Sequence, residues 1–196
     1  MNLPNTITVS RLFLTAGFII FVAWKSTWGH FTALSLFIIA AATDYVDGWI
    51  ARKMNLVTPL GKLLDPLVDK ILVCAAFVFL TAEGLCPVWI TALIIGREFL
   101  VTGLRQIAIE AGKVLAADHL GKWKTTFQLT YLISGLIWLT LETMVKIPSS
   151  LIFFHDLTRP WGPGAWLTPI SLILAVGLTM VSGWNYLWSS RYLLRG

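Results

Sequence analysis

Charged residues are scarce in this chain. Only 13% of its 196 residues are Asp, Glu, Lys or Arg, whereas 57% are hydrophobic, and the mean hydropathy is +0.76. So little charge cannot cover the surface of an ordinary soluble domain. We therefore expect lipid to surround most of the chain, and we expect a single membrane domain over residues 1–196.

The chain is also poor in soft metal ligands. Its two cysteines, Cys74 and Cys86, lie in or beside apolar stretches, and its three histidines are far apart. Neither pattern has the spacing of a zinc site or of paired redox thiols. We interpret the cysteines as small buried side chains and assign the histidines no role. No nucleic-acid-binding motif occurs, so we expect no nucleic acid as a partner.

No alternating strand pattern is visible, and a backbone in lipid must satisfy its own hydrogen bonds, so helices are expected throughout. A helix needs about 20 mainly apolar residues to cross the hydrocarbon core. The stretches that meet this length are Ile7–Trp24, Phe31–Ala51, Leu63–Ala82, Pro87–Ala111, Phe127–Val145 and Leu167–Trp188. The sequence thus predicts an all-α polytopic membrane protein with six transmembrane helices. The longest stretch expected to be irregular is Ile147–Trp166, which contains several Pro and Gly residues.

Lysine and arginine are divided unevenly between the two sides of this predicted bundle. One side carries Arg52, Lys53, Lys62, Lys113, Lys122, Lys124, Arg191 and Arg195, and the other carries Lys25, Lys146 and Arg159. Positive residues accumulate on the cytoplasmic side of membrane proteins, so we expect both termini in the cytoplasm. The net charge of +5 suits anionic headgroups or phosphorylated substrates.

Four aspartates, Asp44, Asp47, Asp65 and Asp69, lie within 26 residues of this hydrophobic chain. Each pair is three or four residues apart and therefore shares one face of its helix. The first pair comes near the end of the second predicted helix and the second pair near the start of the third. Because a short loop makes these helices antiparallel neighbours, all four carboxylates are expected to converge.

Converging carboxylates at the membrane edge would repel one another and lose hydration. Hard divalent cations remove this problem, so the sequence predicts Mg²⁺ or Mn²⁺, with two ions clamping a diphosphate. Gly48 and Gly61 lie beside the carboxylates and leave room for the substrate to approach. For any single aspartate, an equal alternative is a helix cap or an ion pair at the interface with Arg52, Lys53, Lys62 or Lys70.

The pattern Asp44-x-x-Asp47-Gly48-x-x-Ala51-Arg52, then eight residues, then Gly61-x-x-x-Asp65-x-x-x-Asp69, resembles the signature of the CDP-alcohol phosphotransferases. The resemblance implies a six-helix membrane enzyme that transfers a phosphoalcohol from a CDP-linked donor to a hydroxyl and releases CMP. It implies that Asp44, Asp47 and Asp65 bind Mg²⁺ or Mn²⁺. It also implies that Asp69 borders the metal site and acts as general base, and that the enzyme is a homodimer.

Two further runs are similar to the phosphatidylglycerophosphate synthase branch of that family. They are Asn2–Arg11 and Arg97–Arg105, the second followed by Gly121–Thr125 and Gln128. This similarity implies CDP-diacylglycerol as donor and glycerol 3-phosphate as acceptor, with phosphatidylglycerophosphate and CMP as products. It also implies the cytoplasmic membrane of a bacterium, with the active site facing the cytoplasm.

For the phosphate of the acceptor, the candidates are Arg97, Arg105, Lys122 and Lys124. The two arginines project from nearby faces of one predicted helix, where an uncompensated charge is costly. Guanidinium binds phosphate through two parallel hydrogen bonds, and lysine adds a point charge. The alternative is that the lysines only set topology and that the arginines pair internally with Glu98 or Glu110.

For CDP-diacylglycerol, the candidates are Asn5, Thr8, Arg11, Gly48, Arg52, Thr58 and Gly61. Asn5, Thr8 and Arg11 recur every three residues and would form one polar stripe on the first helix. A helix end resting at the membrane interface would explain this stripe equally simply, and a plain turn would explain Thr58.

Three other functions are alternatives for this sequence. The first is the same chemistry with serine, inositol, inositol phosphate or phosphatidylglycerol as acceptor. The second is an intramembrane prenyltransferase, whose two acidic motifs are expected farther apart than they are here. The third is a divalent-cation transporter, but transport sites lie near the bilayer centre, whereas these aspartates fall at helix ends.

Overall fold

The computed structural model describes residues 3–54, 59–110, 112 and 119–191. The side chains of residues 3–9, 44–54, 59–67, 69, 110 and 119 lie outside that description. The long helices are α1 (Leu3–Ala23), α2 (Thr27–Met54), α3 (Pro59–Ala82), α4 (Val88–Glu110), α5 (His119–Glu142) and α7 (Leu167–Ser190). No strand occurs in these ranges, so the predicted all-α class is confirmed.

The stretch between α5 and α7 is less irregular than its Pro and Gly content predicts. It contains the 3₁₀-helix η1 (Ser149–Leu151) and the short helix α6 (Ile152–Thr158). The expectation of an irregular loop over the whole of Ile147–Trp166 is therefore wrong. Thr158 ends α6 and is buried. Its backbone carbonyl accepts a hydrogen bond from the Thr168 hydroxyl at 2.7 Å.

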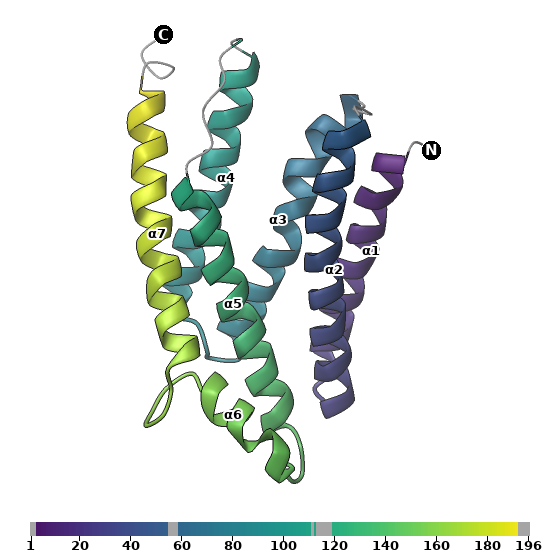
Figure 1. Cartoon of the computed structure of the whole chain (residues 1–196), viewed down its shortest axis with the longest axis vertical. Helices are drawn as coiled ribbons and strands as arrows, with labels where there is room; N and C mark the ends of the chain where they lie inside the picture. Colours follow the sequence, from purple (N-terminus) through teal and green to yellow (C-terminus); the bar gives the residue numbers. More distant parts are fainter. Residues whose placement is uncertain (1–2, 55–58, 111, 113–118, 192–196) are drawn as a thin grey trace.

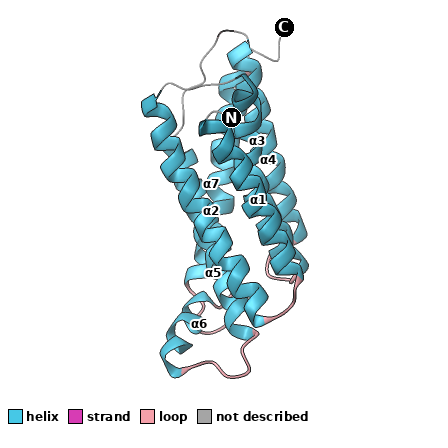
Figure 2. Cartoon of the chain, turned by 90° about the vertical axis from the view of Figure 1, so that its right-hand side faces the viewer, coloured by secondary structure: helices cyan, strands magenta, loops and turns pink. Residues whose placement is uncertain are grey.

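The helices lie roughly side by side and alternate in direction (Figures 1 and 2). The start of α1 and the end of α7 lie at one end of the bundle, together with the end of α2 and the start of α3. We call this the basic end, because Arg52, Lys53, Lys62 and Arg191 fall in or beside the helix ends there. The turns from α1 to α2 and from α3 to α4, and helix α6, lie at the far end.

Aromatic and aliphatic side chains fill the core of the bundle. Helix α1 packs against α2 and α3, and α5 packs against α2, α3 and α7. Phe18, Phe37 and Phe77 are completely buried at these crossings, and the Phe18 and Phe37 rings lie 5.7 Å apart. The Tyr131 ring stacks on Phe77, and its hydroxyl donates to the Leu85 carbonyl at 3.0 Å. This hydrogen bond ties α5 to the turn between α3 and α4.

The turn from α3 to α4 depends on a glycine. Gly84 has a φ of 75°, in the left-handed region that side chains with a Cβ rarely adopt. Two hydrogen bonds close the end of α3 here: Leu85 N–H donates to the Leu80 carbonyl at 2.8 Å, and Gly84 N–H donates to that of Thr81 at 3.0 Å. This is the Schellman pattern, and it satisfies carbonyls that the helix end leaves without partners.

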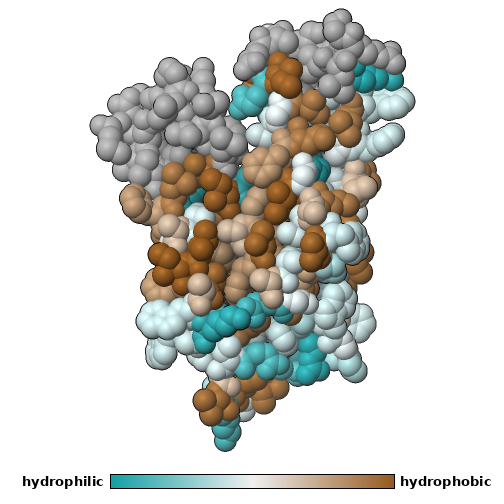
Figure 3. Space-filling model, turned by 180° about the vertical axis from the view of Figure 1, so that it is seen from behind, coloured by the Kyte–Doolittle hydropathy of each residue, from teal (hydrophilic) through white to brown (hydrophobic). Residues whose placement is uncertain are grey.

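The surface carries many large apolar side chains. Figure 3 shows the molecule from behind the view of Figure 1. On this face hydrophobic residues cover the middle of the molecule, and hydrophilic ones gather toward the far end. By length and composition, α7 is the one helix among the described residues that is long and apolar enough to cross a membrane. Shorter apolar helical segments are Ser10–Ala23, Thr27–Thr43 and Lys70–Ala82.

Candidate active site

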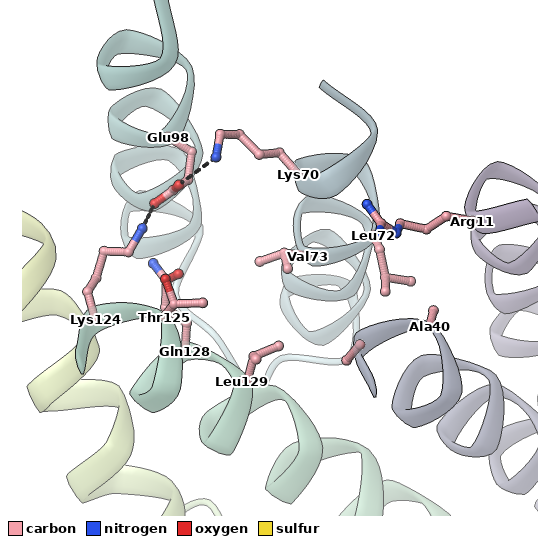
Figure 4. A pocket seen from close by; sticks show the side chains of 11 residues that line it. Arg11, Ala40, Lys70, Leu72, Val73, Glu98, Lys124, Thr125, Gln128 and Leu129 are labelled. Atoms are coloured by element: carbon pink, nitrogen blue, oxygen red, sulfur yellow. Dashed lines mark hydrogen bonds and ion pairs between the residues drawn. The ribbon is translucent and has the colours of Figure 1, made fainter. Parts of the chain in front are cut away.

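A cavity of about 230 Å³ opens among the helices, between their midpoints and the basic end. Its charged lining residues are Arg11 from α1, Lys70 from α3, Glu98 from α4 and Lys124 from α5 (Figure 4). Ala40, Ala41, Leu72, Val73, Thr125, Gln128 and Leu129 complete the wall. Five helices thus contribute to one cavity that contains three basic side chains and one acidic side chain.

Glu98 is the centre of the charged cluster. One carboxylate oxygen, Oε1, contacts the Lys124 ammonium, and the other, Oε2, lies 3.4 Å from Lys70 Nζ. Arg97 Nη1 lies 3.5 Å from Oε1. Figure 4 shows the two lysines reaching Glu98 from opposite sides, each from a different helix. The carboxylate therefore joins α3, α4 and α5 at one point.

Burial makes these ion pairs obligatory. The side chain of Lys124 is only 4% exposed and that of Glu98 is 9% exposed. An ionised group this far from water needs an opposite charge, because its lost hydration is worth several kcal/mol. The start of α5 is polar in sequence, and Glu98 compensates the charge of Lys124 there.

Arg97 links this cluster to α7. Its Nη2 donates to the Ser182 hydroxyl at 2.8 Å, and its side chain crosses close to Gly183. A Cβ added at Gly183 would lie 3.1 Å from Arg97 Cγ, so the glycine is what allows this close approach. Arg97 Nε is buried and has no hydrogen-bond partner among the described residues. The predicted alternative of an internal Arg97–Glu98 pair is observed, at 3.5 Å.

The other predicted acceptor residues lie apart from this cavity. Arg105 Nη2 donates to the Tyr186 hydroxyl at 2.8 Å, and its guanidinium lies 5.7 Å from the centre of the same ring. Lys122 is exposed at the start of α5. Neither residue lines the cavity. Of the four candidates, the structure therefore brings Lys124 into the cavity and Arg97 against Glu98.

Among the predicted donor residues, Arg11 has a described side chain, and it is buried in the cavity wall. Asn5 and Thr8 lie in α1, and Gly48, Arg52 and Gly61 lie in α2 and α3, but their surroundings fall outside the description. Thr58 lies outside the described residues altogether. Arg11, predicted for the donor, and Lys124, predicted for the acceptor, therefore share one cavity.

The four aspartates are placed here by their backbone alone, because their side chains are not described. Asp47 and Asp65 lie seven and six residues from the helix ends that flank the α2–α3 turn, which is about 10 Å along each helix. Asp44 and Asp69 each lie ten residues, or about 15 Å, from the same ends. On two helices of opposite direction, the aspartates therefore pair off at matching depths.

The cavity adjoins these aspartate positions along the helices. Asp44 is one helical turn from Ala40, and Asp69 is one turn from Val73, so each pair shares a helix face. Elsewhere among the described side chains, no group of three or more His, Cys, Asp or Glu could hold a metal ion. Four carboxylate positions at two matched depths fit the oxygen ligands that Mg²⁺ and Mn²⁺ prefer.

Sequence analysis missed two charged residues of this cavity. Lys70 was considered only as a partner for the neighbouring aspartates, but its described partner is Glu98. Glu98 was considered only as a partner for arginine, but it also holds two lysines. The sequence does contain a signal for this cluster, because a lone glutamate lies in an apolar helix while nearby helices carry more than one cation. Which helix supplies the cation depends on packing, so the sequence does not reveal it.

Comparison with known proteins agrees with this geometry. Residues 1–181 match the model of the family described as CDP-alcohol phosphatidyltransferase. A Bacillus subtilis protein named CDP-diacylglycerol–glycerol-3-phosphate 3-phosphatidyltransferase is 41% identical over 94% of this chain and 93% of its own length. Proteins of the same name from Pseudomonas fluorescens and Cereibacter sphaeroides are 40% and 31% identical, over 95% and 94% of this chain and 89% and 93% of their own lengths. The chain belongs to the CDP-alcohol phosphatidyltransferase family.

Proposed function

We propose that this protein transfers the phosphatidyl group of CDP-diacylglycerol to glycerol 3-phosphate, giving phosphatidylglycerophosphate and CMP. Relatives 31–41% identical over at least 94% of this chain bear the name of that activity. The structural observation that carries the acceptor is the cavity in which Arg11, Lys70 and Lys124 meet beside the aspartate positions. The two lysines suit a phosphorylated acceptor better than serine or inositol, while Arg11 in the same cavity is left for the donor.

The divalent metal, two ions of Mg²⁺ or Mn²⁺, would be held by Asp44, Asp47, Asp65 and Asp69. When bound, the metal would neutralise charge on the diphosphate of the donor and on the departing CMP. A carboxylate oxygen of Asp69 would also accept the proton of the acceptor hydroxyl. An ordinary carboxylate is a far weaker base than an alkoxide, so Asp69 depends on correct placement and on the charge around it.

The nucleotide and diphosphate of the donor would lie along Asn5, Thr8, Arg11, Gly48, Arg52, Thr58 and Gly61. Arg11 is included because a buried arginine does not give up its proton, so it presents a positive charge that an anion can contact. The acceptor phosphate would be bound by Lys124, with Arg97, Arg105 and Lys122 as the further candidates. Lys70 joins them, since it lines the same cavity as Lys124.

The long helices would span the cytoplasmic membrane of a bacterium, with the basic end in the cytoplasm. Exposed tryptophans support this arrangement, since tryptophan gathers at both membrane interfaces. Trp24, Trp28, Trp89, Trp161 and Trp166 are exposed near the far end, and Trp123, Trp184 and Trp188 are exposed near the basic end. Along α7, Trp166 and Trp184 are about 27 Å apart, close to the thickness of the hydrocarbon core, about 30 Å.

One assay tests this function. The purified full-length protein would be supplied with CDP-diacylglycerol, magnesium and, in separate reactions, glycerol 3-phosphate, glycerol, serine, inositol, inositol phosphate and phosphatidylglycerol. We expect CMP release that depends on glycerol 3-phosphate and is much slower with the others. Equal CMP release with glycerol would show that the acceptor phosphate is not recognised. No CMP release with any acceptor would contradict the enzyme assignment. Chemical cross-linking in native membranes would test the homodimer that family membership suggests.

A further inference from the structure

Glu98 is an unexpected residue in the wall of a cavity that binds an anion. Of the charged residues that line the described cavity, three are basic and Glu98 alone is acidic. A carboxylate facing a phosphate would weaken binding by charge repulsion unless it served another purpose. The contacts of Glu98 indicate that purpose, because both of its carboxylate oxygens are engaged by cations.

We propose that Glu98 is a positioning residue for acceptor recognition, which holds the ammonium groups of Lys70 and Lys124 at the cavity wall so that both meet the same phosphate. This inference rests on the proposed function and deepens its acceptor site. Glu98 does not touch the substrate in this role. It acts through the two lysines, which come from different helices.

The geometry supplies the first reason. Lys70 Nζ lies 3.4 Å from Glu98 Oε2, while Lys124 donates to Oε1, so each oxygen fixes a different lysine. A lysine side chain is long and flexible, and its ammonium group does not keep one place without a partner. An ammonium group has three N–H donors. After one contact with Glu98, each lysine keeps two further N–H donors, and no other partner is seen for them among the described side chains.

Electrostatics supplies the second reason. Lys70, Arg97 and Lys124 all lie around one carboxylate, and without its negative charge these three cations would repel one another. Lys124 is nearly enclosed by protein, so it could not relax into water as an exposed lysine does. With Glu98 present, Lys70, Arg97, Lys124 and the carboxylate together sum to about +2, the charge that complements a phosphate dianion.

Arg97 supplies the third reason, because it fixes Glu98 itself. Its guanidinium contacts Glu98 Oε1 at 3.5 Å and donates to Ser182 on α7 at 2.8 Å. The carboxylate is thereby connected to a helix that does not line the cavity. A carboxylate braced on one side can hold two flexible lysines on the other. Arg97 accordingly contributes to phosphate binding from behind the cavity wall.

The test is the Glu98→Gln protein, which keeps the shape of the side chain and removes its charge. CMP release would be measured with glycerol 3-phosphate varied at saturating CDP-diacylglycerol, and then with the donor varied. We expect the KM for glycerol 3-phosphate to rise about tenfold or more, as for the loss of a charge-assisted hydrogen bond. The KM for the donor should change little, whereas the midpoint of thermal unfolding should fall, because Lys124 stays buried without its counter-charge. Glu98→Asp, which keeps the charge but shortens the reach, should give an intermediate KM.

Glu83→Gln is the matched control, because Glu83 also pairs with a lysine, Lys25, at the far end of the bundle. It should leave both KM values unchanged. A double-mutant cycle with Lys70→Met adds a second readout. If Glu98 acts through the lysines, Glu98→Gln should raise the KM less in the Lys70→Met background than in the wild type.

A normal KM for glycerol 3-phosphate in Glu98→Gln would overturn the proposal. So would an equal rise in both KM values, because that is the result of a purely structural role. Should Glu98→Gln fail to fold, Glu98→Asp and Lys70→Met decide: a selective rise in both supports the positioning role, and a normal KM in either contradicts it. Failure of the proposed function is distinct, since the wild type would then release no CMP in response to glycerol 3-phosphate.

Discussion

Two lysine–glutamate pairs, one at each end of the bundle, differ sharply in what they do for the molecule. At the far end, Lys25 Nζ lies 3.6 Å from Glu83, and the side chain of Lys25 is 79% exposed. Near the basic end, Lys124 and Glu98 are almost completely enclosed. An exposed pair contributes little because water and salt screen it, whereas a buried pair cannot be separated without leaving a charge uncompensated. The same chemical pair is incidental in one half and indispensable in the other.

The surroundings of the two pairs follow the same division. Toward the far end large apolar side chains dominate the interior, with Phe18, Phe37, Phe77 and Leu80 completely buried and uncharged polar residues such as Thr168 between them. Toward the basic end the interior contains a cavity with four charged side chains. Dense packing is what stabilises the first region, since side chains lose dispersion contacts if a void opens. The second region gives up that packing, and we infer that it does so to leave room for a charged substrate.

The largest effect is expected from removing a metal ligand. Under the proposed function, Asp47→Asn takes one anionic oxygen from the metal site, so activity should fall to background even at high magnesium. Because Asn has nearly the size of Asp, the helical content and the unfolding temperature should stay close to the wild type. CMP release and circular dichroism on the same preparation would check both statements. Near-normal turnover at limiting magnesium would mean that Asp47 is not a ligand.

Next in size is a cavity made in the apolar half. Phe77 is completely buried and stacks on Tyr131, so Phe77→Ala should lower the free energy of unfolding by about 3 kcal/mol. We take the lower part of the range because helices in lipid lose dispersion contacts but little hydrophobic driving force. Thermal unfolding in detergent measures the loss. Both KM values of the folded fraction should be unchanged, and a selective rise in either would show that the two halves are coupled.

Third is the buried lysine of the charged half. Lys124→Met preserves most of the length of the side chain and removes its charge, so the KM for glycerol 3-phosphate should rise roughly ten- to a hundredfold. The KM for CDP-diacylglycerol should change much less. Steady-state CMP release at varied acceptor concentration measures this.

Arg105→Ala refines the same experiment. Arg105 donates to Tyr186 and does not line the cavity, so its effect on the acceptor KM should be clearly smaller than that of Lys124→Met. A larger effect for Arg105 would shift the phosphate site toward α7. The sequence alone favours Arg105 and gives Lys124 an assisting part, because guanidinium binds phosphate through two parallel hydrogen bonds and lysine adds a point charge.

The sequence predicted the helices well where apolar residues decide them. The last predicted span, Leu167–Trp188, matches α7, Leu167–Ser190, almost residue for residue. The fifth was predicted to start at Phe127, but α5 begins at His119. Hydropathy stops at the charged run before Phe127, whereas the helix continues because Lys124 finds its counter-charge on α4. Helix α6 was missed because seven residues are too few for a periodic pattern to emerge.

The candidate site was predictable to the extent that it is local in sequence. The four aspartates form a pattern of fixed spacing on two neighbouring helices, and the family signature follows from it. The cluster of Lys70, Glu98 and Lys124 joins three helices, and its members are up to 54 residues apart. Which face of each helix meets the others is set by the packing of the whole bundle. No spacing rule in a single sequence contains that information.

The smallest effect is expected from the exposed pair, and it is the direct counterpart of Lys124→Met. Lys25→Met removes the same charge by the same substitution, but Lys25 keeps most of its surface in contact with solvent. Exposed ion pairs contribute between about 0 and 1 kcal/mol, so the free energy of unfolding should change by less than about 0.5 kcal/mol. Neither KM should move. Thermal unfolding of the two Met variants side by side, at low and at high salt, would measure the contrast: salt should erase what little Lys25 contributes and leave the effect of Lys124 largely intact. Equal losses of stability in the two variants would mean that burial does not distinguish these pairs, and the division of the bundle into a packed half and a charged half would lose its physical basis.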